Sequence, residues 1–268
     1  MADTTLNGER VTGLLKDRLS KLGFEVYPLK VGWYNSVLPP SLRLAYPDDS
    51  LAVVVLSTPT MFEQALMPFL EERGCQGLSD PIDQCVKHCV TSSVLQCFPG
   101  QSVDVRYDYE LLPSRKPKFL AQTAAHVSGA AFYYQQSDVT DQPWAEKVKM
   151  FGVCMHPRFG GWFAIRALLV FRDVTVGFEV VQPVPPDCVP TREGRIQLLE
   201  AFNFHWQQDW SYRNIVCPVQ TYSQKQRDYF STPPAQRLAL LKSWGILPID
   251  DHQPESDSNA RSQINGHG

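Results

Sequence analysis

Leu51-Ala-Val-Val-Val-Leu56 is the longest uninterrupted apolar run in the chain, and the turn-forming residues Ser57, Thr58 and Pro59 follow it directly. A short apolar run bounded in this way predicts a β-strand that is buried on both faces. Thr58 suits the N-cap of a helix, and Pro59 suits the first turn. We therefore expect a helix that ends at Gly74 and presents Met61, Phe62, Ala65, Leu66, Phe69 and Leu70.

The segments on either side of this strand also carry regular apolar spacing. Steps of three and four residues predict an N-terminal amphipathic helix through Val11, Leu14, Leu15, Leu19 and Leu22. Residues 24–34 are rich in β-branched and aromatic side chains, so they predict a strand that enters a loop before Leu38-Pro-Pro40. A helix predicted over 81–97 places Cys85 and Cys89 on its inward face. Buried thiols are favoured over metal ligands there, because no second close pair completes four ligands.

The rest of the pattern completes one α+β domain. Residues 103–109 alternate apolar and polar side chains, which is the clearest strand signal in the chain. A helix with small residues is predicted from Pro117 to about Gln135. Further strands are predicted at 150–155, 162–171 and 176–181, and further helices at 192–204, 223–230 and 233–244. The composition turns polar after residue 247, so we expect a single domain over 1–247 and a disordered tail over 248–268.

Composition disfavours several classes of protein. The 268 residues include 25 basic and 28 acidic side chains, and a net charge of −3 gives no reason to expect nucleic-acid binding. No apolar run approaches the roughly 20 residues of a membrane-spanning helix, and the N-terminal stretch lacks the apolar segment of a signal peptide. The seven cysteines are an odd number and lie scattered, which favours reduced thiols. We therefore expect a cytoplasmic protein without a membrane anchor.

The common enzyme motifs are absent from the sequence, including the Walker loop, Gly-x-Gly-x-x-Gly after a strand, His-Glu-x-x-His, the nucleophile elbow and Cys-x-x-Cys. The predicted helix over 117–135 is more informative. Gln122, His126, Gly129 and Tyr133 follow one another by four, three and four residues, so they would share one face. That face could line a pocket. The alternative is that His126 is simply a hydrogen-bonded histidine on a packed helix.

Glycines and arginines mark a second candidate site. Gly160 and Gly161 occupy a turn between two predicted strands and would let a ligand approach the backbone. Arg166 lies within an apolar strand, where an unpaired guanidinium is costly, so it needs an anion from this chain or from a ligand. Arg213 and Arg237 lie in similar aromatic or apolar settings. Three such arginines would suit a ligand with carboxylates.

Longer strings of sequence carry a family resemblance. In order along the chain they are Gly23-Phe-Glu-Val-Tyr-Pro28, Leu38-Pro-Pro40, Leu56-Ser-Thr-Pro59, Asp83-Gln-Cys-Val86, Leu120-Ala-Gln-Thr-Ala-Ala-His-Val127, His156-Pro-Arg-Phe-Gly-Gly-Trp-Phe-Ala-Ile-Arg166, Asp187-Cys-Val-Pro-Thr-Arg192, Phe202-Asn-Phe-His-Trp206 and Phe230-Ser-Thr-Pro-Pro-Ala-Gln-Arg-Leu-Ala-Leu-Leu241. With these strings the chain closely resembles the cobalamin-processing proteins of the cblC type, the methylmalonic aciduria and homocystinuria type C family.

The resemblance implies a cytosolic enzyme and vitamin B12 chaperone whose fold is similar to flavin-dependent nitroreductases. Such an enzyme removes the upper axial ligand of cobalamin. It would reduce cyanocobalamin with electrons from NADPH through FMN or FAD, and it would transfer the alkyl group of alkylcobalamins to glutathione. The implied partners are the type D protein of the same pathway, the methionine synthase branch, the methylmalonyl-CoA mutase branch and a second copy of the chain in a ligand-dependent homodimer.

The resemblance also implies site residues. It assigns cobalamin contacts to Asp108, Phe119, Leu120, Ala121, Gln122, His126, Tyr133, Tyr134, Gln135, Cys154 and Ile165. It assigns glutathione contacts to Arg166, Arg213 and Arg237. No catalytic side chain is implied, because the glutathione thiolate or a reduced flavin would supply the chemistry. No metal ligand is implied either, because the corrin holds the cobalt.

The chain departs from the family that it resembles at two places. Ser114-Arg-Lys116 stands where the mammalian members carry Asn-Arg-Arg, and the tail is short and polar instead of Pro- and Ser-rich. The Asp-x-His-x-x-Gly pattern of B12-dependent mutases is absent, so cobalamin is expected to bind base-off without a lower axial histidine. Two other hypotheses stay open, a non-catalytic cobalamin carrier and a flavin reductase or nitroreductase with another electron acceptor.

Overall fold

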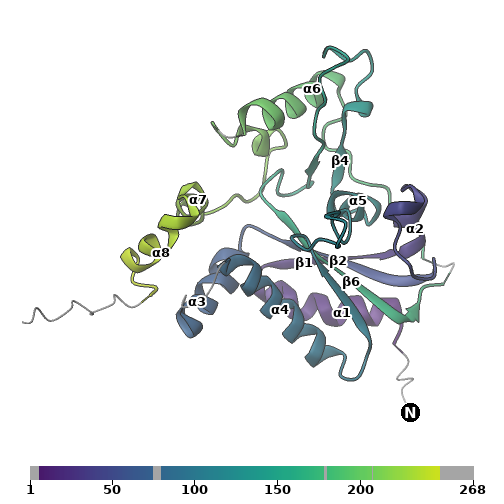
Figure 1. The fold of residues 1–268 in the computed structure, drawn as a ribbon, viewed down its shortest axis with the longest axis vertical. Helices are drawn as coiled ribbons and strands as arrows, with labels where there is room; N and C mark the ends of the chain where they lie inside the picture. The colour runs from purple at the N-terminus through teal and green to yellow at the C-terminus, as the bar shows by residue number, and fades with distance from the viewer. Residues whose placement is uncertain (1–5, 75–79, 178–179, 207, 248–268) are drawn as a thin grey trace, which may run out of the picture.

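A four-stranded antiparallel sheet forms the centre of the computed structural model, which describes residues 6–74, 80–177, 180–206 and 208–247 (Figure 1). Its strand order is β1 (Phe24–Lys30), β2 (Ser50–Ser57), β6 (Ala164–Thr175) and β3 (Val103–Tyr107). All eight residues of β2 are buried, so the prediction of a strand buried on both faces is confirmed.

Two groups of helices cover the two faces of this sheet (Figure 1). Leu51, Val53 and Val55 pack against the first group, and the alternate residues of the same strand pack against the second. The first group is α1 (Gly8–Leu19), the π-helical turn η3 (Phe62–Leu66), α3 (Met67–Arg73) and α4 (Pro81–Cys97). The second group is α2 (Val31–Ser36) and α5 (Ala121–Val127). The apolar run is therefore explained by burial on both sides.

A second, two-stranded sheet of β4 (Phe132–Tyr134) and β5 (Val153–Met155) anchors a third apolar cluster. The helix α6 (Arg192–Glu200) packs on it and continues as the π-helical turn η5 (Ala201–His205). The C-terminal helices are α7 (Gln224–Ser231) and α8 (Pro234–Ser243). The remaining short turns are η1 (Ser20–Leu22), η2 (Pro40–Leu42), η4 (Gln136–Asp138) and η6 (Ser211–Asn214).

The strand predicted over 24–34 is wrong in its second half. β1 ends at Lys30 and the chain turns at once into α2. This turn buries Tyr34, whose hydroxyl oxygen accepts a hydrogen bond from the backbone N–H of Leu120 at 2.7 Å. A tertiary contact therefore overrides the β-propensity of the segment.

The helix predicted from Pro117 to about Gln135 is also wrong at both ends. Only α5 is helical, and Gly129 adopts a left-handed φ of 73° that ends the helical path. A Cβ at this glycine would lie 2.9 Å from the Pro183 ring, so only glycine fits. Residues after the turn extend into β4, which pairs with β5.

Other boundaries shift for local reasons. Pro59 lies in a turn before the helix and not in its first turn, because the Thr58 hydroxyl donates to the Gly23 carbonyl while accepting from the Thr60 N–H. β3 ends at Tyr107, two residues early, and the strand predicted at 150–155 begins only at Val153.

The strand predicted over 162–171 lies at 164–175, and the described residues of 176–181 form no strand. The other predicted helices are confirmed, and the N-terminal, 81–97, 223–230 and 233–244 segments agree closely. No helix in the described part of the chain is long and apolar enough to cross a membrane. The predicted tail, 248–268, lies outside the described residues.

Candidate functional site

A cavity of about 370 Å³ opens beside the N-terminal end of α5. Its walls come from the loop after α2, from α5 and from β4 and the residue that follows it. The lining residues are Val37, Leu38, Leu120, Gln122, Thr123, His126, Tyr133 and Gln135. Five residues that the sequence assigned to cobalamin therefore share one cavity, although the helix that was expected to align them is much shorter.

The cavity is assembled by a hydrogen bond between two elements. Gln122 and His126 lie one turn apart on α5, whereas Tyr133 arrives on β4. The backbone N–H of Tyr133 donates to Nδ1 of His126 at 3.1 Å. Burial lowers the pKa of His126 against the opposing charge of Asp138, which favours the neutral ring. His126 is therefore hydrogen-bonded within the packed site and also lines the cavity.

The other predicted cobalamin residues near α5 are buried around this cavity or beside it. Phe119 is buried, and Ala121 and Ile165 are half-buried in the same apolar cluster. Cys154 pairs with Tyr133 across the β4–β5 ladder, and its Sγ lies 3.8 Å from the Gln122 carbonyl oxygen. Burial raises the pKa of the Cys154 thiol, so it stays a neutral, packed thiol at physiological pH.

Tyr134 faces a different cluster from Tyr133, as neighbours on a strand do. Its side chain is fully buried, and its hydroxyl donates to Asp187 Oδ1 at 2.7 Å while accepting from the Val189 N–H at 2.7 Å. Burial, together with Asp187, raises the pKa of Tyr134. Its hydroxyl therefore holds the 187–189 segment in place.

Arg166 finds the anion that its apolar strand requires within the chain. Its Nη1 lies 3.9 Å from Asp108 Oδ2, and its Nε donates to Ser57 Oγ at 3.0 Å. Burial raises the pKa of Asp108 although Arg166 opposes this shift. The two predicted site residues are thus brought together, one from β6 and one from the turn after β3.

Arg213 lies among four aromatic rings. Its guanidinium carbon lies 5.2–5.4 Å from the centroids of Trp162, Trp210, Tyr212 and Tyr222. Its Nη1 donates to the Gly161 carbonyl, whereas its Nε is buried and has no hydrogen-bond partner among the described residues. A buried donor without a partner is costly, so this guanidinium is suited to receive an anion.

Arg237 lies on α8, where its Nε donates to the Thr232 carbonyl at 3.0 Å and its guanidinium lies over the Tyr229 ring. The three predicted arginines thus come from β6, η6 and α8. Each arginine contacts its own local partners, which are Asp108 and Ser57 for Arg166, the Gly161 carbonyl for Arg213 and the Thr232 carbonyl for Arg237.

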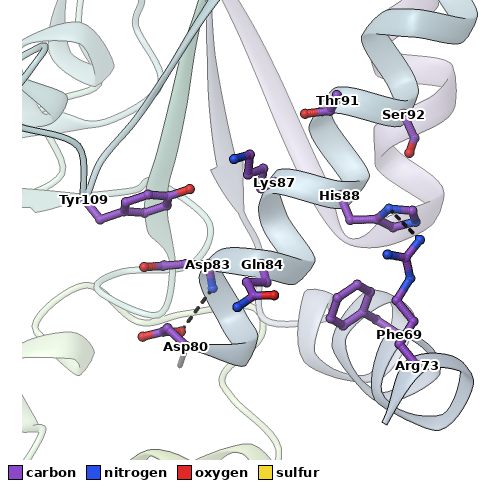
Figure 2. A pocket seen from close by; sticks show the side chains of 10 residues that line it. All are labelled: Phe69, Arg73, Asp80, Asp83, Gln84, Lys87, His88, Thr91, Ser92 and Tyr109. Carbon is purple, nitrogen blue, oxygen red and sulfur yellow. Dashed lines mark hydrogen bonds between the residues drawn. The ribbon is translucent and has the colours of Figure 1, made fainter. Parts of the chain in front are cut away.

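A larger cavity, of about 620 Å³, was missed by the sequence reasoning (Figure 2). It lies along the outer face of α4 and is lined by Phe69, Arg73, Asp80, Asp83, Gln84, Lys87, His88, Thr91, Ser92 and Tyr109. Arg73 and His88 are hydrogen-bonded at one end, and Asp80 and Asp83 lie at the other. Only the spacing of charges along α4 could have indicated it, and that spacing is equally typical of a solvated face.

Asp83 lies in this cavity and interacts electrostatically with the Asp108–Arg166 ion pair. Burial and the nearby charges of Asp80 and Asp108 raise the pKa of Asp83 to about 6, although Arg166 opposes the shift. Cys85 and Cys89 lie on the opposite, buried side of the same helix, as predicted.

Comparisons with known proteins agree with the motifs. The methylmalonic aciduria and homocystinuria type C family matches residues 23–241. A Danio rerio protein named cyanocobalamin reductase / alkylcobalamin dealkylase is 60% identical over 245 residues, which make up 90% of this chain and 97% of that protein. The Homo sapiens protein of the same name is 52% identical over 227 residues, or 85% and 79% of the two chains.

A solved structure shares the fold. The crystal structure of a C. elegans B12-trafficking protein, CblC, matches with a TM-score of 0.79 at 30% identity and covers 91% of this chain and 97% of that chain. The family match spans the central sheet, the α5 cavity and all three arginines. This chain belongs to the methylmalonic aciduria and homocystinuria type C family.

Proposed function

We propose that this chain is a cyanocobalamin reductase and alkylcobalamin dealkylase, which processes vitamin B12 by removing its upper axial ligand. The observation that carries the proposal is the 60% identity, over 90% of the chain, to a protein with that name. Three further relatives of the same name are between 52% and 60% identical to it. At such identity over nearly the whole length, a change of reaction would need a rebuilt site.

Cobalamin is proposed to bind at the α5 cavity. The assignment takes in Asp108, Phe119, Leu120, Ala121, Gln122, His126, Tyr133, Tyr134, Gln135, Cys154 and Ile165, and it is supported by the five of these residues that line the cavity. The corrin carries amide side chains, for which Gln122 and Gln135 offer both donors and acceptors. We expect cobalamin to bind base-off without a lower axial histidine, because the chain lacks the Asp-x-His-x-x-Gly pattern of the B12-dependent mutases.

Glutathione is proposed to act on alkylcobalamins through Arg166, Arg213 and Arg237. The unpartnered Nε of Arg213 supports this role, because a carboxylate of the tripeptide would satisfy it. In the reaction, the glutathione sulfur forms a bond to the alkyl carbon and the cobalt–carbon bond breaks. The bonding pair stays on cobalt, which leaves as cob(I)alamin. The arginines would hold the tripeptide, and the buried Cys154 would take no part.

For the reduction of cyanocobalamin, the flavin and NADPH are proposed from the family resemblance alone. FMN or FAD would supply electrons from NADPH for the loss of cyanide, within a fold similar to the nitroreductases. The residues that line the α5 cavity include no lysine or arginine to hold a flavin phosphate. They do not fit the phosphate end of a flavin, so we assign no flavin contact to them.

The cellular setting is likewise part of the proposal. We infer a cytoplasmic enzyme and chaperone that works with the type D protein of the pathway and supplies the methionine synthase branch. We also expect a homodimer that depends on ligand. These inferences rest on the family resemblance.

Anaerobic absorption spectroscopy with methylcobalamin tests the proposal. The purified chain should shift methylcobalamin to its base-off spectrum, and adding glutathione should then produce cob(I)alamin. A base-off shift with no further change would favour a non-catalytic carrier. The absence of any shift would contradict the cobalamin assignment, and tight flavin binding in that case would favour a reductase with another electron acceptor.

A further inference from the structure

The turn between β5 and β6 is closed by backbone hydrogen bonds at its base. The N–H of His156 donates to the Gly160 carbonyl at 2.9 Å, and the N–H of Gly160 donates back at 2.9 Å. Gly160 has a left-handed φ of 56°. The turn thus places the backbone of the next residue, Gly161, against the segment that carries Arg213.

His156 fills this turn from within. Its side chain is only 1% exposed, and Phe159 stacks on its ring at a centroid distance of 4.6 Å. Its Nδ1 accepts hydrogen bonds from the backbone N–H groups of Arg158 and Phe159 at 3.1 and 3.3 Å. Since Nδ1 is the acceptor, the proton of the neutral ring lies on Nε2.

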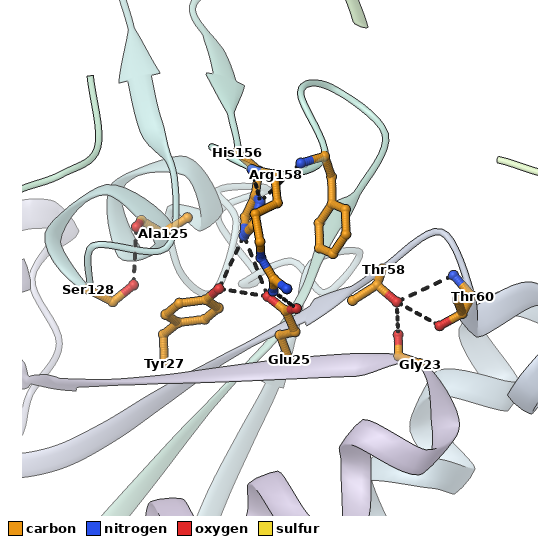
Figure 3. Close-up of polar contacts among 10 residues, drawn as sticks. Gly23, Glu25, Tyr27, Thr58, Thr60, Ala125, Ser128, His156 and Arg158 are labelled. Carbon is orange, nitrogen blue, oxygen red and sulfur yellow. Dashed lines mark hydrogen bonds and ion pairs between the residues drawn. The ribbon is translucent and has the colours of Figure 1, made fainter. Parts of the chain in front are cut away.

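The Nε2 side of His156 enters a closed network with β1 (Figure 3). Nε2 lies 3.1 Å from the Tyr27 hydroxyl, which donates to Glu25 Oε2 at 2.6 Å. The Arg158 guanidinium pairs with the other oxygen of Glu25. Arg158 therefore meets the network twice, with its backbone N–H at His156 and its side chain at Glu25. This arrangement ties the turn to the sheet.

The outer side of the turn holds Arg213. The Gly161 N–H donates to the Arg213 carbonyl at 3.0 Å, and the Gly161 carbonyl accepts from Arg213 Nη1. A Cβ at Gly160 would lie 2.4 Å from the Arg213 carbonyl oxygen, and one at Gly161 would lie 2.9 Å from its Cα. The two backbones are thus packed against each other, and the direction of the guanidinium follows from the position of the turn.

We propose that His156 is a positioning residue for Arg213: its Nδ1 fixes the 156–161 turn, and the Gly161 carbonyl then orients the guanidinium with Nε free for a ligand carboxylate. The inference rests on the proposed function for its ligand, glutathione. His156 is too deeply buried to touch a substrate. It acts through Arg213, so its loss should weaken the binding of glutathione and not the binding of cobalamin.

Two substitutions separate the nitrogens of the ring. His156→Asn keeps an acceptor near the position of Nδ1, because an asparagine side chain readily accepts from the N–H two residues on. His156→Gln reaches toward Tyr27 instead and removes that acceptor. His88→Gln, on α4, is the matched control for a histidine replaced away from the turn.

Glutathione is titrated into the chain without cobalamin, and tryptophan fluorescence reports binding because Trp162 and Trp210 flank Arg213. We expect His156→Gln to raise the dissociation constant and the KM for glutathione about tenfold, equivalent to about 1.4 kcal/mol. His156→Asn and the control should stay within about twofold of the wild type. The kcat at saturating glutathione and the base-off shift of cobalamin should change little in His156→Gln.

A double-mutant cycle with Arg213→Gln excludes a general structural effect. In that background, His156→Gln should add less than about twofold, because the residue through which it acts is gone. An independent tenfold loss there, or equal losses in His156→Asn and His156→Gln, would overturn the inference. If His156→Gln does not fold, Tyr27→Phe takes its place, and we expect a smaller rise of about threefold that Arg213→Gln again abolishes.

The inference and the proposed function fail in different ways. A wild-type chain that binds glutathione but forms no cob(I)alamin contradicts the proposed dealkylation, while the comparison of the His156 variants still decides the positioning role. A wild-type chain that forms cob(I)alamin but whose His156→Gln variant binds glutathione normally overturns only the positioning role. A wild-type chain without any fluorescence response to glutathione overturns the inference as well.

Discussion

Asp108 Oδ2 lies 3.9 Å from Arg166 Nη1, and the other carboxylate oxygen of Asp108 is buried without a hydrogen-bond partner among the described residues. The ion pair is therefore too long for a hydrogen bond, and Asp108 keeps one carboxylate oxygen without a partner in the part of the chain that the structure describes. The Asp108 carboxylate does not accept the two parallel hydrogen bonds that the Arg166 guanidinium could donate. Arg166 consequently keeps hydrogen-bonding capacity for a second anion, which reconciles an internal ion pair with a role in binding a ligand.

Arg166→Gln is expected to weaken the use of glutathione more than the binding of cobalamin. The loss of one charge-assisted hydrogen bond predicts about 1.5–3 kcal/mol in kcat/KM for glutathione. Steady-state dealkylation of methylcobalamin measures this loss. Arg172→Gln, an exposed arginine on the same strand, is the control and should retain the glutathione dependence. Unchanged glutathione dependence in Arg166→Gln would remove Arg166 from the proposed site.

The neighbouring tyrosines of β4 should respond differently to the loss of a hydroxyl. Tyr134→Phe removes two buried hydrogen bonds, although the Val189 N–H still donates to Asp187 Oδ1 at 3.2 Å and Arg195 still pairs with Asp187 Oδ2, so unfolding should become easier by about 1–2 kcal/mol. Tyr133→Phe should leave stability nearly unchanged and weaken the binding of cobalamin, because Tyr133 lines the α5 cavity. Thermal melts and the base-off spectral shift measure the two effects. A destabilised Tyr133→Phe with normal cobalamin binding would contradict this division.

Asp83→Asn should become more stable than the wild type as the pH rises. Burial and like charges raise the pKa of Asp83 to about 6, so the folded state holds this proton more tightly than the unfolded state does. Wild-type stability is therefore lost as the pH rises from about 4 through 6, and the neutral variant escapes that loss. The gain should stay below about 1 kcal/mol, since solvent screens the site and a charge in the first helical turn is favourable.

Melting temperatures of Asp83→Asn and the wild type at pH 4.5 and 7.5 measure this effect. The difference between the two proteins should grow with pH in favour of the variant. Glu71→Gln, an exposed carboxylate on the neighbouring helix α3, should show no such trend. A variant that is less stable than the wild type at the higher pH would show that the charge at the start of the helix outweighs burial.

Capping residues and apolar spacing were sufficient to predict the helices and strands whose buried residues repeat at the period of the element itself. α4 begins at Pro81 and ends at Cys97, as predicted, because Asp80 caps it and its buried apolar residues all face one core. β2 was equally clear, since both of its faces are covered. The helix predicted over 117–135 failed because small residues support a helical pattern on either side of Gly129, whose left-handed backbone the pattern does not encode.

From spacing, the candidate site could be predicted only where its residues share one helix. Gln122 and His126 share a helical face and therefore reached one cavity, whereas Tyr133 joined them through a sheet pairing that periodicity cannot indicate. The network of Tyr27 and His156 joins residues 129 positions apart. No local pattern relates such positions, because the antiparallel sheet alone decides which residues of β1 lie beneath the turn.

Glu25→Gln is expected to lower the free energy of unfolding by about 2 kcal/mol at neutral pH. Burial alone would raise the pKa of Glu25, but hydrogen bonds from His156, Tyr27 and Arg158 outweigh it and lower the pKa to about 2. A carboxylate with a lowered pKa stabilises the fold above its ordinary value of 4.5, and this stabilisation is lost as the pH falls toward 2. The deficit of the variant should therefore be largest at pH 7 and shrink below pH 4.5.

Denaturant unfolding at pH 7 and pH 3.5 measures this dependence, with Glu72→Gln on the exposed side of α3 as the control. A deficit of equal size at both pH values would assign the effect to packing and not to the carboxylate charge. If the deficit does shrink, the Glu25 charge contributes to the network that holds the 156–161 turn. Weaker glutathione binding by Glu25→Gln at pH 7 would then follow, because the same network positions Arg213 through Gly161.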